Sequence, residues 1–302
     1  MDTVVTEPML AATTKAVLIA GPTASGKSRL ALDLARRHGG MVINADSMQV
    51  YRELRILTAR PGVADESIAS HRLYGHVPAA IRYSVGAWIR EVEDAIGKAH
   101  EAGGLPVVVG GTGLYFKALS EGLSEIPPVP ADVRQEVRAL AEGETSEALH
   151  RRLAAIDPRD ARQIRASDRA RILRALDVYM ATGRPLVVWR EQPVEPILDM
   201  SAVARFILEP ERSLLYARID GRAETMITEG AIDEVEALLA LGLSEELPAM
   251  KAIGVRHLAD HLAGNLPLDA ALAGIRTETR RYAKRQLTWF RNQMSDWPRL
   301  AA

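Results

Sequence analysis

Residues 16–28 read AVLIAGPTASGKS, a short apolar run followed by a glycine-rich loop. The run Ala16–Ala20 is typical of a buried parallel strand. Gly21–Ser28 match the pattern G-x-x-x-x-G-K-[ST], and apolar residues at helical spacing follow over Lys27–Arg37. A loop of this pattern between a strand and an amphipathic helix indicates a phosphate-binding P-loop and disfavours an incidental glycine turn.

The loop predicts a diphosphate site made largely of backbone. Its eight members are Gly21, Pro22, Thr23, Ala24, Ser25, Gly26, Lys27 and Ser28. Glycine lets backbone N–H groups turn toward phosphate oxygens, and the helix N-terminus adds its dipole. We expect Lys27 to meet the terminal phosphate and Ser28 to ligate a Mg²⁺ cofactor. The motif does not determine which diphosphate is bound.

The flanking segments predict the fold class. Met41–Ala45 (MVINA) and Leu105–Gly111 (LPVVVGG) have the character of further strands. Ser84 is a candidate N-cap for the helix between them, which the glycines at 103–104 should end. Alternating strands and helices predict an α/β fold, a P-loop NTPase-like core with a parallel sheet.

Beyond Gly122 the sequence pattern changes. Several prolines follow, and no strand pattern returns before about Ala202–Leu208. We therefore predict an inserted helical domain at 123–202. The α/β core would comprise 16–122 and 203–302, after a flexible N-terminal extension at 1–15.

One helix of the insertion is predicted over Arg169–Met180, ended by Gly183. Its apolar face would include Met180, and its charged face would carry Arg171 and Arg174. Further helices are expected at 214–229, 232–241 and 269–291.

Overall composition limits the possible classes. The chain has 302 residues, a formal net charge of -1 and no cysteine, which excludes disulfides and thiolate metal sites. Neither a signal peptide nor an apolar run near the roughly 18 residues of a membrane span is visible. We expect a cytoplasmic protein without membrane association, and a monomer because nothing suggests an obligate dimer.

Positive charge is concentrated in two places. From Arg151 to Arg174 there are eight arginines against three aspartates, and a second basic stretch covers Arg276–Arg291. Such local excess is expected of a protein that binds a phosphate-rich partner. Solvated helix faces explain the charge equally well.

Acidic and imidazole side chains give weaker signals. Asp46 ends the second predicted strand, where a parallel sheet places its ligands, so we favour a catalytic role over a turn cap. The third strand ends in glycines instead of an acid, which argues against a motor ATPase. His257 and His261 have metal-like spacing, but without a third ligand a solvated helix face is favoured.

Five ordered motifs together resemble tRNA dimethylallyltransferases. They are GPTASGKS at 21–28, NADSMQVY at 44–51, TARP at 58–61, GGTGLYFKAL at 110–119 and YAKRQLTWFR at 282–291. The resemblance implies transfer of a dimethylallyl group from dimethylallyl diphosphate to N6 of the adenosine 3′ of the anticodon. It implies tRNA, through its anticodon stem-loop, as the partner, and it implies that the inserted domain at 123–202 binds tRNA.

The resemblance also implies roles for individual residues. The catalytic set would be Asp46, Lys27, Thr112 and Arg222, with Asp46 accepting a proton or hydrogen bond from N6 and Arg222 binding the leaving diphosphate. The tRNA contacts implied are Asp46, Ser47, Met48, Gln49, Thr112, Arg134, Ala170, Arg171, Ile172, Leu173, Arg174, Lys251, Arg256, Lys284 and Arg285. The whole stretch Tyr282–Trp289 matches a tRNA-facing segment.

Two positions depart from the family pattern, with Leu57 where glycine is common and 254–257 where an aromatic and an acid often stand. The main alternative function is a small-molecule or nucleoside kinase that uses the P-loop on ATP, with Asp46 as the base. A non-enzymatic RNA-binding module is a third possibility, although it leaves Lys27, Ser28 and Asp46 without a purpose.

Overall fold

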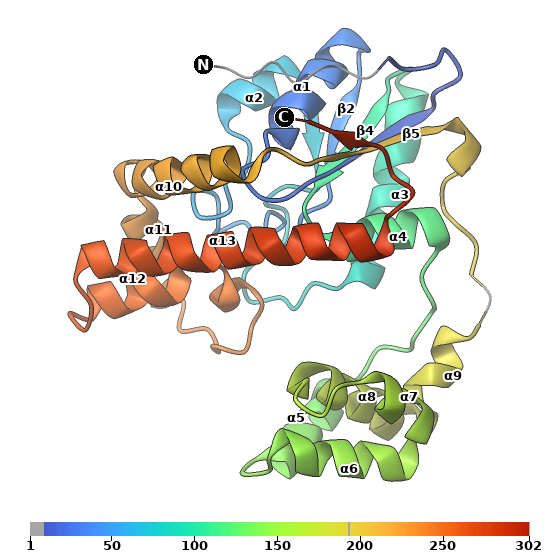
Figure 1. Ribbon diagram of the computed structural model, residues 1–302, viewed down its shortest axis with the longest axis vertical. Helices are drawn as coiled ribbons and strands as arrows, with labels where there is room; N and C mark the ends of the chain where they lie inside the picture. The colour runs from blue at the N-terminus through green and yellow to red at the C-terminus, as the bar shows by residue number, and fades with distance from the viewer. Residues whose placement is uncertain (1–8, 193, 302) are drawn as a thin grey trace. The chain divides into compact units, whose positions relative to one another are not determined.

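The computed structural model describes residues 9–192 and 194–301. The chain divides into two compact units (Figure 1). One comprises Met1–Glu121 and Pro196–Ala302, and the other comprises Gly122–Glu195.

A six-stranded parallel sheet forms the centre of the first unit. Its strands are β1 (Ala16–Ala20), β2 (Met41–Asn44), β3 (Ser70–Arg72), β4 (Pro106–Gly110), β5 (Val203–Leu208) and β6 (Arg299–Leu300). They lie in the order β3-β2-β4-β1-β5-β6, with Leu18 of β1 opposite Val108 and Arg205. The α/β fold with a parallel sheet is confirmed. The short edge strands β3 and β6 were not predicted, because two or three mostly exposed residues carry no strand pattern.

Side-chain alternation along β1 divides the core into two layers. Val17 and Ile19 pack with the apolar face of α1 (Lys27–Arg37) on one side of the sheet. Leu18 and Ala20 pack on the other side with α3 (Val85–Glu101) and α4 (Gly113–Glu121), and the end of α13 (Leu268–Gln293) joins them through Phe290. The predicted Ser84 cap is present, since its side chain accepts a hydrogen bond from the Ala87 N–H.

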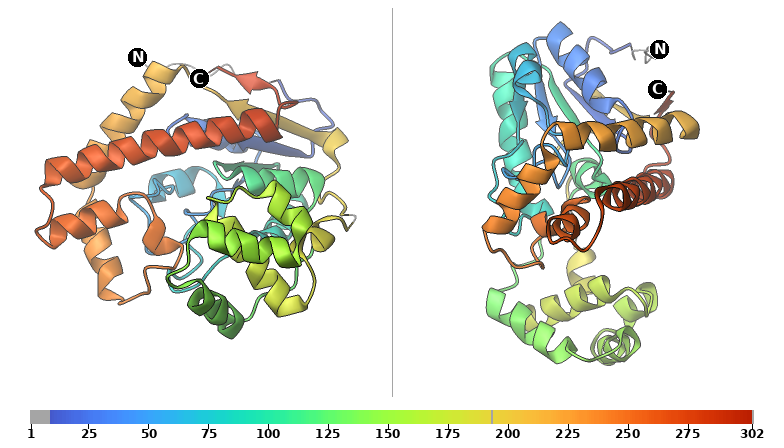
Figure 2. Two further views of the ribbon diagram at one scale, coloured as in Figure 1. Left: turned by 60° about the horizontal axis from the view of Figure 1, so that its bottom comes forward. Right: turned by 90° about the vertical axis from the view of Figure 1, so that its left-hand side faces the viewer.

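Helices after β5 complete the first unit. They are α10 (Arg212–Thr228), α11 (Ala231–Ala240), α12 (Val255–Leu262) and α13, and α10 and α13 lie side by side in Figures 1 and 2. Together they enclose an apolar cluster with the chain that follows β2, including Tyr51, Leu54 and Leu57. The short helix α2 (Val63–Ile68) leads from that segment into β3.

The second unit is entirely helical and has its own core. It contains α5 (Ala131–Ala141), α6 (Ser146–Ile156), α7 (Pro158–Gln163), α8 (Arg169–Thr182) and α9 (Leu186–Arg190), drawn in green to yellow in Figure 2. Leu149, Leu153 and Ile172 are buried in it. Asp168 caps α8, and Gly183 ends it in the left-handed conformation as predicted. Met180, expected on the apolar face, is exposed in the last turn of α8.

The unit boundaries differ from those expected at two places. Pro196–Ala202 belong to the first unit, where Ile197, Leu198 and Met200 pack against the sheet core. In the expected flexible extension, Leu10 packs beside α1 and the Lys15 N–H donates to the Ala202 carbonyl. Residues 1–8 of that extension lie outside the described residues. In the part of the chain that the structure describes, no helix is long and apolar enough to cross a membrane.

Candidate active site

The glycine-rich loop lies between β1 and α1, as its sequence predicts. Gly26 adopts a positive φ of 91°, which an L side chain rarely tolerates, and it forms the N-cap of α1. Lys27 folds back so that its Nζ donates to the Pro22 carbonyl at 3.1 Å. Burial lowers the pKa of Lys27 to about 8; the carboxylate of Asp46 opposes this effect and the guanidinium of Arg222 adds to it. The loop therefore places a lysine with reduced affinity for its proton where an anion would bind.

Asp46 lies in a turn directly after β2. The buried side chain of Asn44 orders this turn by accepting from the Asp46 N–H at 2.8 Å and donating to its carbonyl at 2.9 Å. Asp46 Oδ1 accepts from the Met48 N–H at 2.9 Å. Its Oδ2 has no hydrogen-bond partner among the residues described. Asp46 is thus a turn cap with one carboxylate oxygen left for a ligand.

The loop after β4 supports this turn. Thr112 Oγ1 accepts from the Ser47 N–H at 2.9 Å, and the Thr112 N–H donates to the Ala45 carbonyl at 3.2 Å. Thr112 was predicted as a catalytic and tRNA-contacting residue; its hydroxyl here positions the segment that carries Asp46. No local pattern could reveal the bond to Ser47, because the two residues are 65 positions apart.

Gly111 and Gly113, which follow β4, leave room for the close approach of α13. A Cβ on Gly111 would lie 2.2 Å from Gln286 Nε2, and one on Gly113 would lie 2.1 Å from the Trp289 ring. Glycine at these positions allows a neighbour to approach the backbone closely. In the structure the neighbour is a helix of the same chain.

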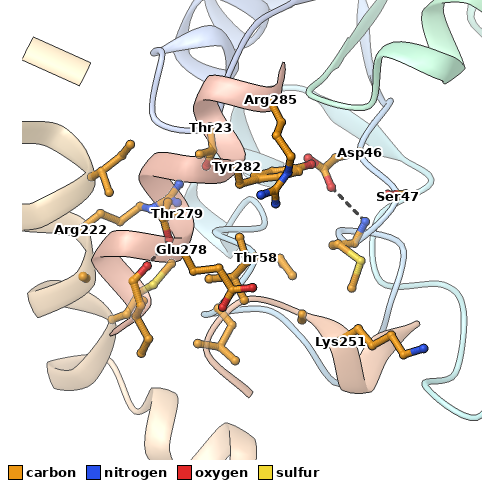
Figure 3. A pocket seen from close by; sticks show the side chains of 18 residues that line it. Thr23, Asp46, Ser47, Thr58, Arg222, Lys251, Glu278, Thr279, Tyr282 and Arg285 are labelled. Carbon is orange, nitrogen blue, oxygen red and sulfur yellow. Dashed lines mark hydrogen bonds between the residues drawn. The ribbon is translucent and has the colours of Figure 1, made fainter. Parts of the chain in front are cut away.

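A cavity of about 260 Å³ opens beside Asp46 (Figure 3). The polar residues that line it are Thr23, Asp46, Ser47, Thr58, Arg222, Lys251, Glu278, Thr279, Tyr282 and Arg285. Its apolar wall comes mainly from α10 and its neighbours, with Leu57, Ile219, Ala223, Met226, Ile253 and Ile275. The arrangement suits a ligand with one charged end and one hydrocarbon end.

Electrostatic interactions around the cavity centre on Asp46. Burial lowers the pKa of the Arg222 guanidinium, while the Asp46 carboxylate favours its charged form. In Figure 3 the Tyr282 side chain projects from α13 toward Asp46. Burial and that carboxylate both raise the pKa of Tyr282, so it stays a neutral phenol. One site therefore contains three of the predicted catalytic residues, Lys27, Asp46 and Arg222. The first and last of them are 195 positions apart in the sequence.

A carboxylate from α11 holds the loop that supplies Leu57 and Thr58. Glu234 accepts from the N–H groups of Arg55, Ile56 and Leu57 at 2.7, 2.7 and 3.0 Å. Gln49, predicted to contact the target nucleotide, uses its Nε2 to donate to the carbonyls of Thr58 and Ala59 at 2.8 and 3.2 Å. Its amide nitrogen is therefore committed to the same loop.

The remaining tRNA candidates of the first unit differ in environment. Lys251 and Arg285 line the cavity, and Ser47 and Met48 line it beside Asp46. Lys284 and Arg256 are exposed. Much of the C-terminal basic stretch serves the fold, because Arg276, Arg280 and Arg291 form ion pairs with Glu224, Asp220 and Glu209. Among the described residues no such ion pair involves Arg281, Lys284 or Arg285.

The predicted tRNA-contacting residues of the second unit lie partly in its core and partly on its surface. Ile172 and Leu173 are buried, so their side chains hold the helical core together and do not form a tRNA-binding surface. Arg171 is 71% exposed beside Asp168 at 3.2 Å, and Ala170 and Arg174 are also exposed. Arg134 donates to the Val129 carbonyl at 2.7 Å.

Neither histidine of the 257–261 segment resembles a metal ligand. His257 Nε2 lies 3.2 Å from Glu278 and His261 Nδ1 lies 3.0 Å from the Leu266 carbonyl, so both rings have protein partners instead of facing only solvent. In residues 9–192 and 194–301 no group of three or more acidic or histidine side chains could hold a metal. The unusual Leu57 lies against Gly254, where a Cβ would be only 2.7 Å from Leu57 Cδ2.

Known protein families match this chain over most of its length. The model of the IPP transferase family matches residues 49–293, and that of isopentenyl transferase matches residues 14–76. The chain belongs to the IPP transferase family, that of the tRNA dimethylallyltransferases. A tRNA dimethylallyltransferase of a Bradyrhizobium species is 52% identical over 94% of this chain and 93% of its own length. That of Azorhizobium caulinodans is 54% identical over 94% and 91%.

Solved structures of the family agree with the fold. The tRNA isopentenylpyrophosphate transferase of Bacillus halodurans is 36% identical with a TM-score of 0.66, covering 95% of this chain and 89% of its own. A eukaryotic dimethylallyltransferase solved acting on tRNA is 28% identical with a TM-score of 0.77, covering 92% and 70%. These matches support a transferase and give no support to the kinase alternative.

Proposed function

We propose that this chain transfers a dimethylallyl group from dimethylallyl diphosphate to N6 of the adenosine next to the anticodon, on its 3′ side, in tRNA. The observation that carries the proposal is the cavity that joins Asp46 and Arg222 to an apolar wall. A nucleoside kinase needs no such wall, whereas a prenyl donor has a charged diphosphate and a five-carbon hydrocarbon tail.

The reaction forms an N6–C1 bond and breaks the C1–O bond and one N6–H bond. The N6 lone pair attacks C1 of the donor, the electrons of the C1–O bond leave with diphosphate, and a proton departs from N6. Asp46 would receive that proton, and the support for this role is that Oδ2 is without a hydrogen-bond partner in the described structure while Oδ1 accepts from the Met48 N–H. Since an adenine amine is a poor nucleophile, holding the two reactants in line supplies much of the acceleration.

The departing diphosphate would lie against the loop amides, Lys27 and Arg222. Binding of an anion restores the proton affinity that Lys27 loses through burial, so positive charge is available where negative charge develops. Mg²⁺ fits this donor set, since the Ser28 side chain is exposed at the start of α1. Mg²⁺ in proteins commonly takes one or two protein ligands together with phosphate oxygens and water. It would neutralise diphosphate charge.

The adenine of a stacked anticodon loop must leave its stack to reach a partly buried carboxylate, so we propose that the base is flipped into the cavity. Exposed basic side chains would bind the surrounding phosphates, with Lys251, Lys284 and Arg285 in the first unit and Arg171 and Arg174 in the inserted one. Cytoplasmic location and the monomeric state stay predictions.

One assay tests the proposal directly. The protein is incubated with labelled dimethylallyl diphosphate or labelled ATP, with and without tRNA that lacks the modification. We expect label in tRNA only from the prenyl donor. Phosphoryl transfer from ATP would establish the kinase instead, and binding of tRNA without either transfer would indicate an RNA-binding module.

A further inference from the structure

The segment Tyr282–Trp289 of α13 contains one polar side chain that faces the protein interior. Gln286 is 5% exposed, whereas its neighbours Lys284 and Arg285 are exposed side chains. A buried amide must be hydrogen-bonded or it costs stability. Both ends of this one are bonded, because Oε1 accepts from the Thr23 N–H at 2.9 Å and Nε2 donates to the Gly111 carbonyl at 2.9 Å.

These two bonds connect the loop proposed to bind the leaving diphosphate with the loop that supports Asp46. Thr23 belongs to the diphosphate loop, and Gly111 precedes Thr112, which fixes the turn of Asp46 through Ser47 and Ala45. A Cβ on Gly111 would also lie 3.3 Å from Asp46 Oδ2. The amide therefore spans the gap between the leaving-group loop and the carboxylate loop.

We propose that Gln286 is a positioning residue for the transfer step, which sets the spacing between the diphosphate loop and Asp46. The inference rests on the proposed function, and it differs from the role in tRNA contact that the family resemblance implies for this stretch. An amide suits the position because it donates and accepts without charge. A carboxylate would lose the donor and bring negative charge toward the bound diphosphate, and a thioether would provide neither bond.

The test compares Gln286→Met, which keeps the length, with Gln286→Glu, which keeps the acceptor, and with Lys284→Ala on the exposed face of the same helix. We measure tRNA affinity without donor, the single-turnover rate constant at saturating donor and tRNA, and calorimetric binding of inorganic diphosphate. Circular dichroism checks folding. Gln286→Met should lower the rate constant about 10- to 100-fold and weaken diphosphate binding about 3- to 10-fold, because the reacting groups and the Thr23 N–H are no longer held in fixed positions. Its tRNA affinity should stay within about twofold, whereas Lys284→Ala should weaken tRNA binding.

Gln286→Glu adds a readout that a tRNA contact would not give. A protonated glutamic acid regains the donor, so the rate constant of this variant relative to the parent should rise as the pH falls, at unchanged tRNA affinity. An unchanged rate constant in Gln286→Met, or a loss explained wholly by tRNA affinity, would overturn the proposal. If Gln286→Met does not fold, a pH-independent ratio for Gln286→Glu overturns it. A parent protein without prenyl transfer refutes the proposed function instead, and the diphosphate measurement still decides whether the bridge matters.

Discussion

Replacing Lys27 by Met should make the free protein more stable at neutral pH and abolish prenyl transfer. Burial holds the lysine pKa near 8, below its ordinary value of 10.5. At about 1.4 kcal/mol per pKa unit this difference sets an upper limit of about 3.5 kcal/mol. The Lys27 side chain keeps some contact with solvent, which reduces the expected gain to about 1–2 kcal/mol.

The sign follows from proton linkage. Because the folded pKa lies below the unfolded one, the unfolded chain binds more protons between about pH 8 and pH 10.5, and the stability of the parent rises with pH through that window. The loss of stability caused by burying the charged lysine is complete below about pH 8 and disappears near pH 10.5. The methionine variant has no such group at this position, so the difference in unfolding free energy should be largest at pH 7 and close as the pH rises.

The assay is urea denaturation followed by tryptophan fluorescence at pH 7, 8, 9 and 10. Lys98→Met is the control, because Lys98 is exposed on α3 beside Asp94 and its loss should change stability by less than about 0.5 kcal/mol. Added diphosphate should stabilise the parent but not Lys27→Met. A variant less stable than the parent at pH 7, or a difference that does not vary with pH, would refute this account of the buried lysine.

Three further variants test other parts of the protein. Asp46→Asn should lower the single-turnover rate constant roughly 100- to 10,000-fold with little effect on tRNA affinity, and a near-normal rate would leave Asp46 only its turn-capping role. Arg171→Ala with Arg174→Ala should weaken tRNA binding, leave donor affinity unchanged and flatten the plot of log affinity against log salt by about 0.7 to 0.9 for each phosphate no longer bound; an unchanged slope would mean a merely solvated face. Glu234→Gln should raise the KM for the donor and speed amide hydrogen exchange at residues 55–57, because an amide oxygen cannot replace a carboxylate that accepts three N–H groups. Glu236→Gln, exposed on the same helix, is its control, and equal exchange in both variants would contradict the loop-holding role.

Local chemistry explains why much of the fold was visible in the sequence. The P-loop needs glycines between a strand and a helix, and the strands of a buried parallel sheet are short apolar runs, so β1, β2, β4 and β5 were all predicted. Asp46 could be singled out because parallel strands deliver their last residues to a shared edge of the sheet. Membership of the family followed from motif order.

The sequence by itself therefore determined the parallel sheet, the P-loop and the strand-end position of Asp46, since each depends on neighbours a few residues away. Only the tertiary structure decided what surrounds them. Gln286 bonds residues 175 and 263 positions distant, and Glu234 holds a loop 177 to 179 positions away. A helical period predicts which side of a helix is apolar, but not which segment will cover it. For that reason Gln286, in a stretch with Lys284 and Arg285, resembled an RNA-facing side chain until the fold placed it between two loops of the site.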